Sequence, residues 1–482
     1  MANSPSATLP NQLQPWYPLP IARCSAFERA SVLETDRRRS NAESQSHARH
    51  DVQKELTGKS TYAPMAGLTA FIATVYTNCG KVSRAKFVSS LSFARSAMKP
   101  PIYLDCNAST QPDPEVVEAM LPWLGATHAN PHAGHLAGQR AAKAVDTALQ
   151  AIASLIGASP SEMVITSGAT ESNNLALQGI LSQSPNVSRL LHSSIEHKAV
   201  IEVGAHLRTR GVSVETIPVN RQGRVEVEAA AKIIESGHFN LNLASIMHAN
   251  NEIGTIQPIE EVSNLLRSKN GILHVDAAQT AGRLRIDVAA MGVDLLSISS
   301  HKMYGPSGIG ALYISRRARK LIHPLFFGGG QQSGLRPGTL PVFLIIGFGK
   351  ACETALNGME RDALHTEVLA DSFCNFLSEF GVNFKTFDCG GPNLPGLRSI
   401  RFIGADADDL VMRASPKLSI SSGSACTSGS IHRSHVLQAL RFSDDEAREV
   451  VRIGFGRQST MSEAYEAARI LADAAACMSR LG

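Results

Sequence analysis

The sequence predicts an α/β protein built on one doubly wound, mostly parallel sheet, with a second, smaller α+β domain after it. Three observations lead to this fold class. Short apolar runs of strand length alternate with amphipathic stretches of helix length up to residue 314, which is typical of parallel sheets. Several runs end in polar or charged residues, as the ligand-binding edge of an open α/β sheet does. Beyond residue 330 the alternation stops, and one long helical stretch is followed by short strands.

The apolar periods place the elements in order. Strands are expected at 101–105, 163–166, from 190, at 212–219, 243–247, 272–276, 295–299, 310–314, near 383, at 398–402 and at 450–454. Helices are expected from 113, at 139–156, from the turn at 167–172 to 181, after 197, at 225–236, 259–268, 344–380, 407–413 and 462–481. We therefore expect a large domain at 113–345 and a small one at 346–482, with residues 98–112 packed on the small domain.

Composition narrows the class of protein. A formal net charge of +4 over 482 residues is too small to indicate nucleic-acid binding. We find no stretch that is long and apolar enough to span a bilayer, and the best candidate, 63–76, is short and contains threonines. The eight cysteines are scattered without a CxxC pair, which indicates reduced thiols in a reducing compartment. We expect a cytoplasmic protein, or a mitochondrial one if residues 1–97 hold a presequence.

Residues 1–97 differ from the rest of the chain. Proline, serine, arginine and glutamine are frequent, and no acidic residue lies between Thr57 and Leu104. Such a segment can be an organellar presequence. Disorder is the alternative that we favour, and a true start at Met98 is a third. We predict that this extension carries no catalytic residue.

The stretch around Lys302 organises the predicted site. The apolar run 295–299 is followed by Ser300, His301 and Lys302, and then by a Tyr-Gly-Pro turn. The Lys302 ammonium should therefore lie just past the carboxyl end of a strand. In a dry pocket such a lysine can lose its charge and become the amine nucleophile that a Schiff base requires. An isolated lysine after a strand is usually a surface residue. Whether Lys302 is a functional residue therefore depends on its partners elsewhere in the chain.

Those partners match the needs of pyridoxal phosphate. The turn 166–170 lies between a strand and a helix, and the free N–H groups at such a helix start bind phosphate. Asp276 ends a buried strand, where an acid can keep the cofactor's ring nitrogen protonated. Other side chains near these strand ends could complete the site: His197 flat on the ring, Gln279 on its phenol oxygen, and Ser299 and His301 on the phosphate.

These residues lie in longer strings that carry a family resemblance. The strings are Ile102-Tyr103-Leu104-Asp105, 166–172, Glu196-His197-Lys198-Ala199-Val200, Asn250-Asn251-Glu252-Ile253-Gly254, His274-Val275-Asp276-Ala277, Ser300-His301-Lys302 and 421–428. Residues 98 to about 460 resemble the pyridoxal-phosphate cysteine desulfurases of the class V aminotransferase group. The resemblance implies fold type I of the pyridoxal-phosphate enzymes, with a sulfur-accepting protein as partner. No metal site is expected, because no cysteine or carboxylate lies near the loop histidines His128, His132 and His135.

The resemblance also implies a role for each site residue. Lys302 would carry the cofactor and later move protons, Asp276 would pair with the pyridinium, and His197 would stack on the ring and act in acid–base steps. Ala169, Thr170, Ser299 and His301 would hold the phosphate, and Asn250 and Gln279 would contact the ring oxygen, with Asn250 also near the substrate. Thr339 would reach the phosphate of a second subunit, which implies a homodimer. Arg457 would bind the substrate carboxylate as a bidentate fork.

Cys426 is the candidate nucleophile. It lies in Ser-Gly-Ser-Ala-Cys-Thr-Ser-Gly, a run of small polar residues, whereas a structural cysteine normally has apolar neighbours. The resemblance implies that the Cys426 thiolate attacks the sulfur of bound cysteine, becomes a persulfide and releases alanine. A mobile loop could then carry the persulfide to an acceptor.

Some positions depart from the family's common pattern and leave the acceptor open. The chain reads Gln331-Gln332-Ser333 where an acidic–basic pair is common, and it has Pro337 and Cys106 at two further atypical positions. Iron–sulfur cluster assembly and a thio-modification are both compatible with this sequence. The competing interpretations are a selenocysteine lyase or another class V lyase, and a non-catalytic scaffold on the same fold.

Overall fold

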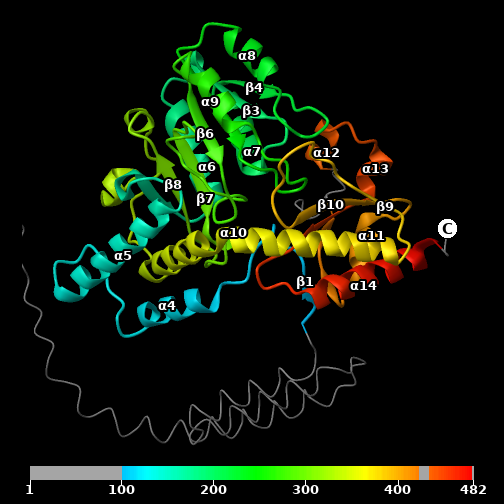
Figure 1. The fold of residues 1–482 in the computed structure, drawn as a ribbon. Coiled ribbons are helices and arrows are strands. Elements are labelled where there is room, and N and C mark those ends of the chain that lie inside the picture. The colour runs from blue at the N-terminus through cyan, green and yellow to red at the C-terminus, as the bar shows by residue number, and fades with distance from the viewer. Residues whose placement is uncertain (1–99, 423–433, 480–482) are drawn as a thin grey trace, which may run out of the picture. The chain divides into compact units, whose positions relative to one another are not determined.

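The computed structural model describes residues 100–422 and 434–479 (Figure 1). Its largest sheet has seven strands in the order β2-β8-β7-β6-β5-β3-β4. The strands are β2 (Met163–Thr166), β3 (Ser188–Ser193), β4 (Ser213–Ile217), β5 (Leu241–Met247), β6 (Ile272–Asp276), β7 (Leu295–Ser299) and β8 (Gly310–Ile314). Only β8 runs against its neighbours, so β2 and β7 point the same way. The predicted doubly wound, mostly parallel sheet is confirmed.

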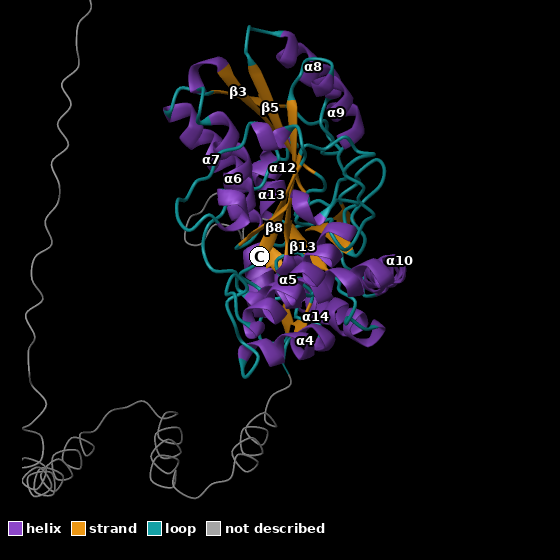
Figure 2. Cartoon of the chain, turned by 90° about the vertical axis from the view of Figure 1, so that its left-hand side faces the viewer, coloured by secondary structure: helices purple, strands orange, loops and turns teal. Residues whose placement is uncertain are grey.

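Both faces of this sheet are buried. Neighbouring strand residues point to opposite faces, so Leu273 and Leu296 pack in one apolar cluster while Ile272 and Leu295 pack in another. Figure 2 shows helices on both sides of the sheet. They are α6 (Ala169–Leu181) and α7 (Lys198–Thr209) on one face, and α8 (Val227–Glu235) and α9 (Ile259–Arg267) on the other. The register of the strands determines which strand ends meet at the edge of the sheet.

A long helix, α10 (Val342–Glu379), packs against α4 (Pro114–Leu124), α5 (Leu136–Ser154) and α14 (Met461–Ser479). One window of α10 is long and apolar enough for a membrane span. This corrects the prediction that no stretch of the sequence is long and apolar enough to span a bilayer. However, 56% of that window is buried inside the fold, so its apolar side chains are accounted for by contacts with other helices.

A four-stranded antiparallel sheet forms beside α14, in the order β12-β13-β10-β9. Its strands are β9 (Phe384–Thr386), β10 (Leu397–Phe402), β12 (Ser421–Ser422) and β13 (Val450–Gly454), and the nearby helices are α11 (Ala407–Ala414), α12 (His435–Ala439) and α13 (Asp444–Arg448). The start of the described chain joins this region, because β1 (Ile102–Tyr103) pairs with β11 (Leu418–Ser419). Leu104 packs with Phe373 and Val451 in a third apolar cluster.

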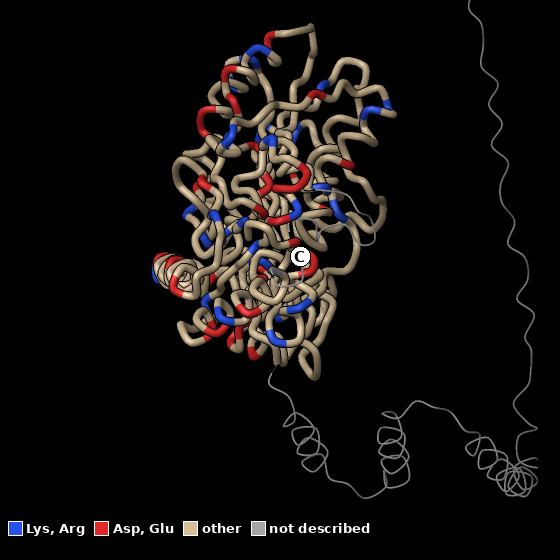
Figure 3. Tube along the Cα trace, turned by 90° about the vertical axis from the view of Figure 1, so that its right-hand side faces the viewer, with Lys and Arg blue, Asp and Glu red and all other residues tan. Residues whose placement is uncertain are grey.

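Charged residues of both signs are interspersed along the described chain, as Figure 3 shows. This distribution agrees with the small net charge of the sequence.

Candidate active site

The carboxyl ends of three strands line one cavity of about 360 Å³. Met247, Asp276 and Ser299 end β5, β6 and β7, and all three line it. The strand register pairs Met247 with Asp276 and Asp276 with Ser297, so β5 and β6 end level and β7 continues two residues further, to Ser299. Most of the predicted site residues meet here: Ala169, Thr170, His197, Asp276, Gln279, Ser299, His301 and Lys302.

The predicted phosphate turn is an uncapped helix start. Gly168 occupies the N-cap position of α6 with φ of 152°, a backbone conformation that favours glycine, and no side chain caps the helix. The first N–H groups of a helix have no partner within the helix and carry its positive dipole end. Ala169 and Thr170 begin α6 and line the cavity. This turn can therefore accept an anion from the cavity.

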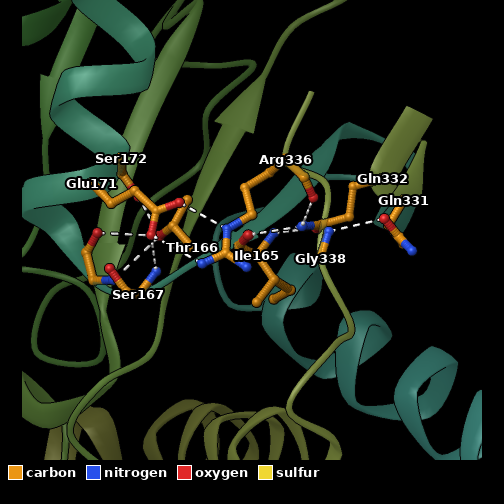
Figure 4. Close-up of polar contacts among 10 residues, drawn as sticks. Ile165, Thr166, Ser167, Glu171, Ser172, Gln331, Gln332, Arg336 and Gly338 are labelled. Carbon is orange, nitrogen blue, oxygen red and sulfur yellow. Dashed lines mark hydrogen bonds and ion pairs between the residues drawn. The ribbon is translucent and has the colours of Figure 1, made fainter. Parts of the chain in front are cut away.

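A network that the sequence did not predict secures this turn (Figure 4). Glu171 accepts a hydrogen bond from Ser167 N at 2.7 Å and pairs with Arg336, whose Nε lies 2.8 Å from its carboxylate. Burial alone would raise the pKa of Glu171, but the hydrogen bonds to Arg336 and Ser167 outweigh it and lower that pKa. The Arg336 guanidinium thus neutralises the Glu171 carboxylate beside the turn at the start of α6, which can accept an anion.

Gln332 fixes the chain segment that carries Arg336 to the free edge of the sheet. Its Oε1 accepts from Ile165 N at 2.6 Å, and its Nε2 donates to Ile165 O at 2.9 Å, so the side-chain amide pairs with edge strand β2 as a backbone would (Figure 4). Gln332 has a left-handed backbone with φ of 52°. One of the atypical glutamines of the sequence is therefore a structural anchor.

Asp276 is buried and held by defined donors. Asn173 Nδ2 donates to its Oδ2 at 2.7 Å, and Ala278 N donates to its Oδ1 at 3.0 Å. Asn173 lies one turn into α6, and its own Oδ1 has no partner within the described chain. Sequence reasoning missed Asn173 because its role depends on a contact across 103 positions.

Lys302 ends a 3-10 turn directly after β7. Its Nζ donates to the backbone carbonyl of Asn107 at 2.6 Å, and Gln279 Nε2 donates to the same oxygen at 2.9 Å. Asn107 Nδ2 in turn donates to Gln279 Oε1 at 3.2 Å. Asn107, which is only 1% exposed, thus orders both predicted residues.

The two site histidines favour the neutral form. His197 caps α7, and its Nδ1 accepts from Ala199 N at 3.1 Å, so the ring proton of the neutral form lies on Nε2. Desolvation lowers the pKa of His197; Asp276 opposes this shift, and the charges of Lys302 and Lys198 add to it. Burial and the Lys302 charge lower the pKa of His301 to about 4.

Two predicted residues lie away from the cavity lining. Asn250 is fully buried, and its amide accepts from Glu252 N and Ile253 N and donates to Ile195 O, which stabilises a turn. Its neighbour Asn251 lines the cavity instead. Thr339 is exposed and does not line the cavity of its own chain. Cys426 lies in 423–433, outside the described residues.

Arg457 is also away from the lining. Its Nε lies 2.8 Å from Asp362 Oδ2, its Nη1 lies 3.2 Å from Asp113 Oδ2, and its guanidinium stacks 4.1 Å above the Tyr304 ring. Its guanidinium therefore lies beside two carboxylates, and the role of Arg457 in binding the substrate carboxylate stays a prediction.

A second buried arginine lies closer to the cavity. Arg452 pairs with Asp105 at 2.7 Å and donates to the backbone oxygen of Asn251 at 3.2 Å. Its Nε makes no hydrogen bond within the described residues, and the same holds for the Nε of Arg457 despite its closeness to Asp362. A buried arginine with an unused donor is suited to bind an anion. No sequence signal separated Arg452 from Arg457, since both lie in one short run.

Comparison with known proteins supplies the family. The family model described as aminotransferase class-V matches residues 102–465. The chain belongs to this family. It is 42% identical over 369 residues to a protein named mitochondrial cysteine desulfurase from Arthroderma benhamiae, covering 75% of this chain and 72% of that protein. It is 40% identical over 373 residues to cysteine desulfurase IscS from Rickettsia rickettsii, covering 77% and 90% of the two chains.

A solved structure supports the same assignment. A NifS-like protein superimposes with a TM-score of 0.71 at 32% identity, covering 77% of this class-V chain and 98% of its own.

Proposed function

We propose that this chain is a pyridoxal-phosphate-dependent cysteine desulfurase that takes sulfur from L-cysteine, releases L-alanine and holds the sulfur as a persulfide on Cys426. The observation that carries the proposal is the cavity in which Lys302, Asp276 and His197 face an uncapped helix start. The relatives named cysteine desulfurase support the choice of substrate.

The residues around the cavity fit the cofactor. Pyridoxal phosphate, when bound, supplies an electron sink for the bonds at the substrate's α-carbon. The start of α6, with Ala169 and Thr170, would hold its phosphate together with Ser299 and His301. Asp276 would pair with the ring nitrogen, and Gln279 would contact the ring oxygen. Asn250 is proposed to act near the ring oxygen and the substrate, together with its neighbour Asn251, which lines the cavity.

The chain's own groups would move the protons and the sulfur. The Lys302 amine would remove the proton from the substrate's α-carbon and hold it at Nζ, and His197, with its ring proton on Nε2, would exchange a proton with the substrate. The Cys426 thiolate would form an S–S bond with the substrate sulfur as the C–S bond breaks. The electron pair of that bond would stay with carbon, which is then protonated to give alanine.

Arg452 is the proposed partner of the substrate carboxylate. Its guanidinium is buried, contacts Asn251 of the cavity wall and has one unused donor. The Arg457 guanidinium lies beside Asp113 and Asp362 instead, and neither of these residues lines the cavity.

A homodimer is the proposed assembly. Val117, Leu121 and Leu124 form an exposed apolar stripe on α4 at helical spacing, and Phe327 is 89% exposed. Such surfaces commonly mark protein interfaces. The exposed Thr339 would then reach the cofactor phosphate of the other subunit. Each subunit of this dimer would consist of a cofactor domain at 113–345 and a small domain at 346–482, with residues 98–112 packed on the small domain.

The sulfur acceptor is proposed to be a scaffold or sulfur-carrier protein, in iron–sulfur cluster assembly or thio-modification. The proposed compartment is the cytoplasm, or the mitochondrion if residues 1–97 act as a presequence, as the mitochondrial relative suggests. Fractionation of cells producing the full chain, with and without residues 1–97, distinguishes the two compartments.

The decisive experiment uses Cys426→Ala. We expect this variant to bind the cofactor and keep its visible absorbance, but to lose at least about a hundredfold of sulfide release from cysteine, because the accepting thiolate is absent. Mass spectrometry of the parent protein after incubation with cysteine should find one added sulfur on the peptide with Cys426. The variant Cys477→Ala, which removes an exposed cysteine of α14, is the matched control. Full sulfide release by Cys426→Ala would contradict the proposal, and activity restricted to selenocysteine would favour a lyase.

A further inference from the structure

Tyr304 lies two residues after Lys302 in an unusual backbone conformation. Its φ is 64°, in the left-handed region that a bulky residue rarely adopts. The residue is also buried, with 7% of its surface exposed. Such conformations persist only where the surrounding structure holds them, and they concentrate at functional sites.

Two groups hold the backbone of the turn on either side of Lys302. Tyr304 N donates to Thr110 Oγ1 at 2.6 Å, and the same hydroxyl donates to the carbonyl of His301 at 2.9 Å. Thr110 therefore bridges the residues that flank Lys302 and Met303. On the far side, Asp113 N donates to Tyr304 O at 2.9 Å.

Arg457 holds the side chain of Tyr304. Its backbone N–H donates to Tyr304 Oη at 2.7 Å, and its guanidinium lies 4.1 Å above the ring. The chain before it also comes close: a Cβ built on Gly456 would lie 3.0 Å from Tyr304 Oη and 2.6 Å from Cys106 Sγ. A side chain at 456 would therefore push the Arg457 backbone away from the tyrosine.

Two carboxylates from other elements fix the guanidinium itself. Asp113 caps the N-terminus of α4, and Asp362 lies in α10. The side chains of Arg457, Asp113 and Asp362 are 10%, 16% and 15% exposed, so the ion pairs are largely shielded from solvent. Buried pairs of this kind are weakly screened and geometrically defined. The guanidinium thus connects β13, α4 and α10 to the turn that carries Lys302.

We propose that Arg457 and Tyr304 are positioning residues for Lys302. Arg457 fixes the ring of Tyr304, and Tyr304 fixes the left-handed turn, so that the Lys302 amine stays at the cavity beside the Asn107 carbonyl. The inference rests on the proposed function only for the role of Lys302 in carrying the cofactor. It gives Arg457 a role in the placement of the amine rather than in the recognition of substrate.

The test compares Arg457→Ala with Arg452→Lys. Misplacement of a reacting group by a fraction of an ångström lowers turnover steeply, so we expect kcat of Arg457→Ala to fall about tenfold or more, with less than about a threefold change in KM for L-cysteine. Arg452→Lys should show the reverse, a KM raised about thirtyfold with a smaller loss in kcat. Arg469→Ala, which removes an exposed arginine of α14 paired with Glu466, is the control and should change neither constant.

A second readout needs no cofactor. In cofactor-free protein, an amine-selective reagent labels Lys302, and peptide mass spectrometry gives its rate. Arg457→Ala should raise this rate at least about threefold, because a loosened turn releases the amine from the Asn107 carbonyl. Tyr304→Phe removes only the Oη contact and keeps the ring, so it should cause a smaller change in the same direction. It also serves as the test if Arg457→Ala does not fold.

The outcomes separate the two roles of Arg457. A KM raised about thirtyfold with unchanged labelling of Lys302 would mean that Arg457 binds the substrate carboxylate and would overturn the inference. Unchanged labelling in both Arg457→Ala and Tyr304→Phe would overturn it as well. If the parent protein lacked desulfurase activity, the proposed function would fail, while the labelling of Lys302 would still test the positioning role.

Discussion

The carboxyl edge of the large sheet and the β13–α14 connection both supply charged groups near the cavity, but they were predictable to different degrees. At the sheet edge, residues read from strand ends converge as the sequence predicted, because parallel strands in register bring their carboxyl ends to the same edge. At β13–α14, Arg452 and Arg457 are five positions apart, and the structure gives them different surroundings. The strand register sets the positions of the strand-end residues, whereas the contacts of the long arginine side chains set where Arg452 and Arg457 point.

The largest expected effect tests the sheet edge. Asp276→Asn keeps the shape of the side chain but removes the charge that would hold the cofactor's ring nitrogen protonated, so turnover should fall roughly a hundredfold or more. Steady-state kinetics at saturating cofactor measures this loss. The control is Asp294→Asn, because Asp294 is equally buried but precedes β7 at the other end of the sheet and pairs with Arg317.

Asp294→Asn should lower stability without changing the turnover of the folded fraction. An equal loss of turnover in both variants would show that a buried carboxylate anywhere in this sheet matters, and that the carboxyl edge is not special.

How far sequence reasoning reached follows from the same comparison. The strands at 272–276, 295–299, 310–314 and 450–454 match the predicted bounds residue for residue, since each is an apolar run with clear breakers. The short helices α12 and α13 and the pairing of β1 with β11 were not predicted, because a few residues carry too little periodicity.

Within the site, strand-end residues could be predicted and their supports could not. Asn107, Asn173 and Arg336 act on residues at least 103 positions away, and nothing local to them indicates those contacts. Asn250 and Asn251 show that the sequence does not tell two adjacent asparagines apart, because the backbone of the turn sets which of them lines the cavity. The role of Cys426 stays a prediction.

A smaller effect is expected at the start of α6, where the phosphate of the cofactor is proposed to bind. Arg336→Ala would leave the Glu171 carboxylate uncompensated beside the start of α6, where it would repel a phosphate. The affinity of the cofactor-free protein for pyridoxal phosphate should fall about tenfold, while the affinity for pyridoxal, which lacks the phosphate, should change little. Equilibrium dialysis with each compound measures both. Gln331→Ala is the matched control, since its side-chain oxygen accepts from Gly338 N in the same segment.

The double variant Arg336→Ala with Glu171→Gln should regain most of the lost affinity, because the repelling charge is then absent. If both compounds lost affinity equally, Arg336 would hold the shape of the segment rather than the charge at the start of α6.

The smallest effect concerns a buried acid behind the sheet edge. Glu196 is fully buried and accepts from Met247 N at 2.8 Å, and burial raises its pKa to about 8. The native state therefore keeps a proton that the unfolded state loses above the usual carboxyl pKa, so this residue makes the stability fall as pH rises from about 5 to 8. Glu252, which burial shifts to a pKa of about 7, acts in the same direction.

Glu196→Gln cannot ionise and should flatten part of that dependence, leaving the contribution of Glu252. Urea unfolding of the two proteins at pH 5, 6, 7 and 8 measures the free energy of unfolding directly. The difference between variant and parent should shift in favour of the variant with each step toward pH 8. A constant difference across this range would mean that Glu196 ionises at the same pH in both states, and that the sheet edge tolerates a charge beneath it.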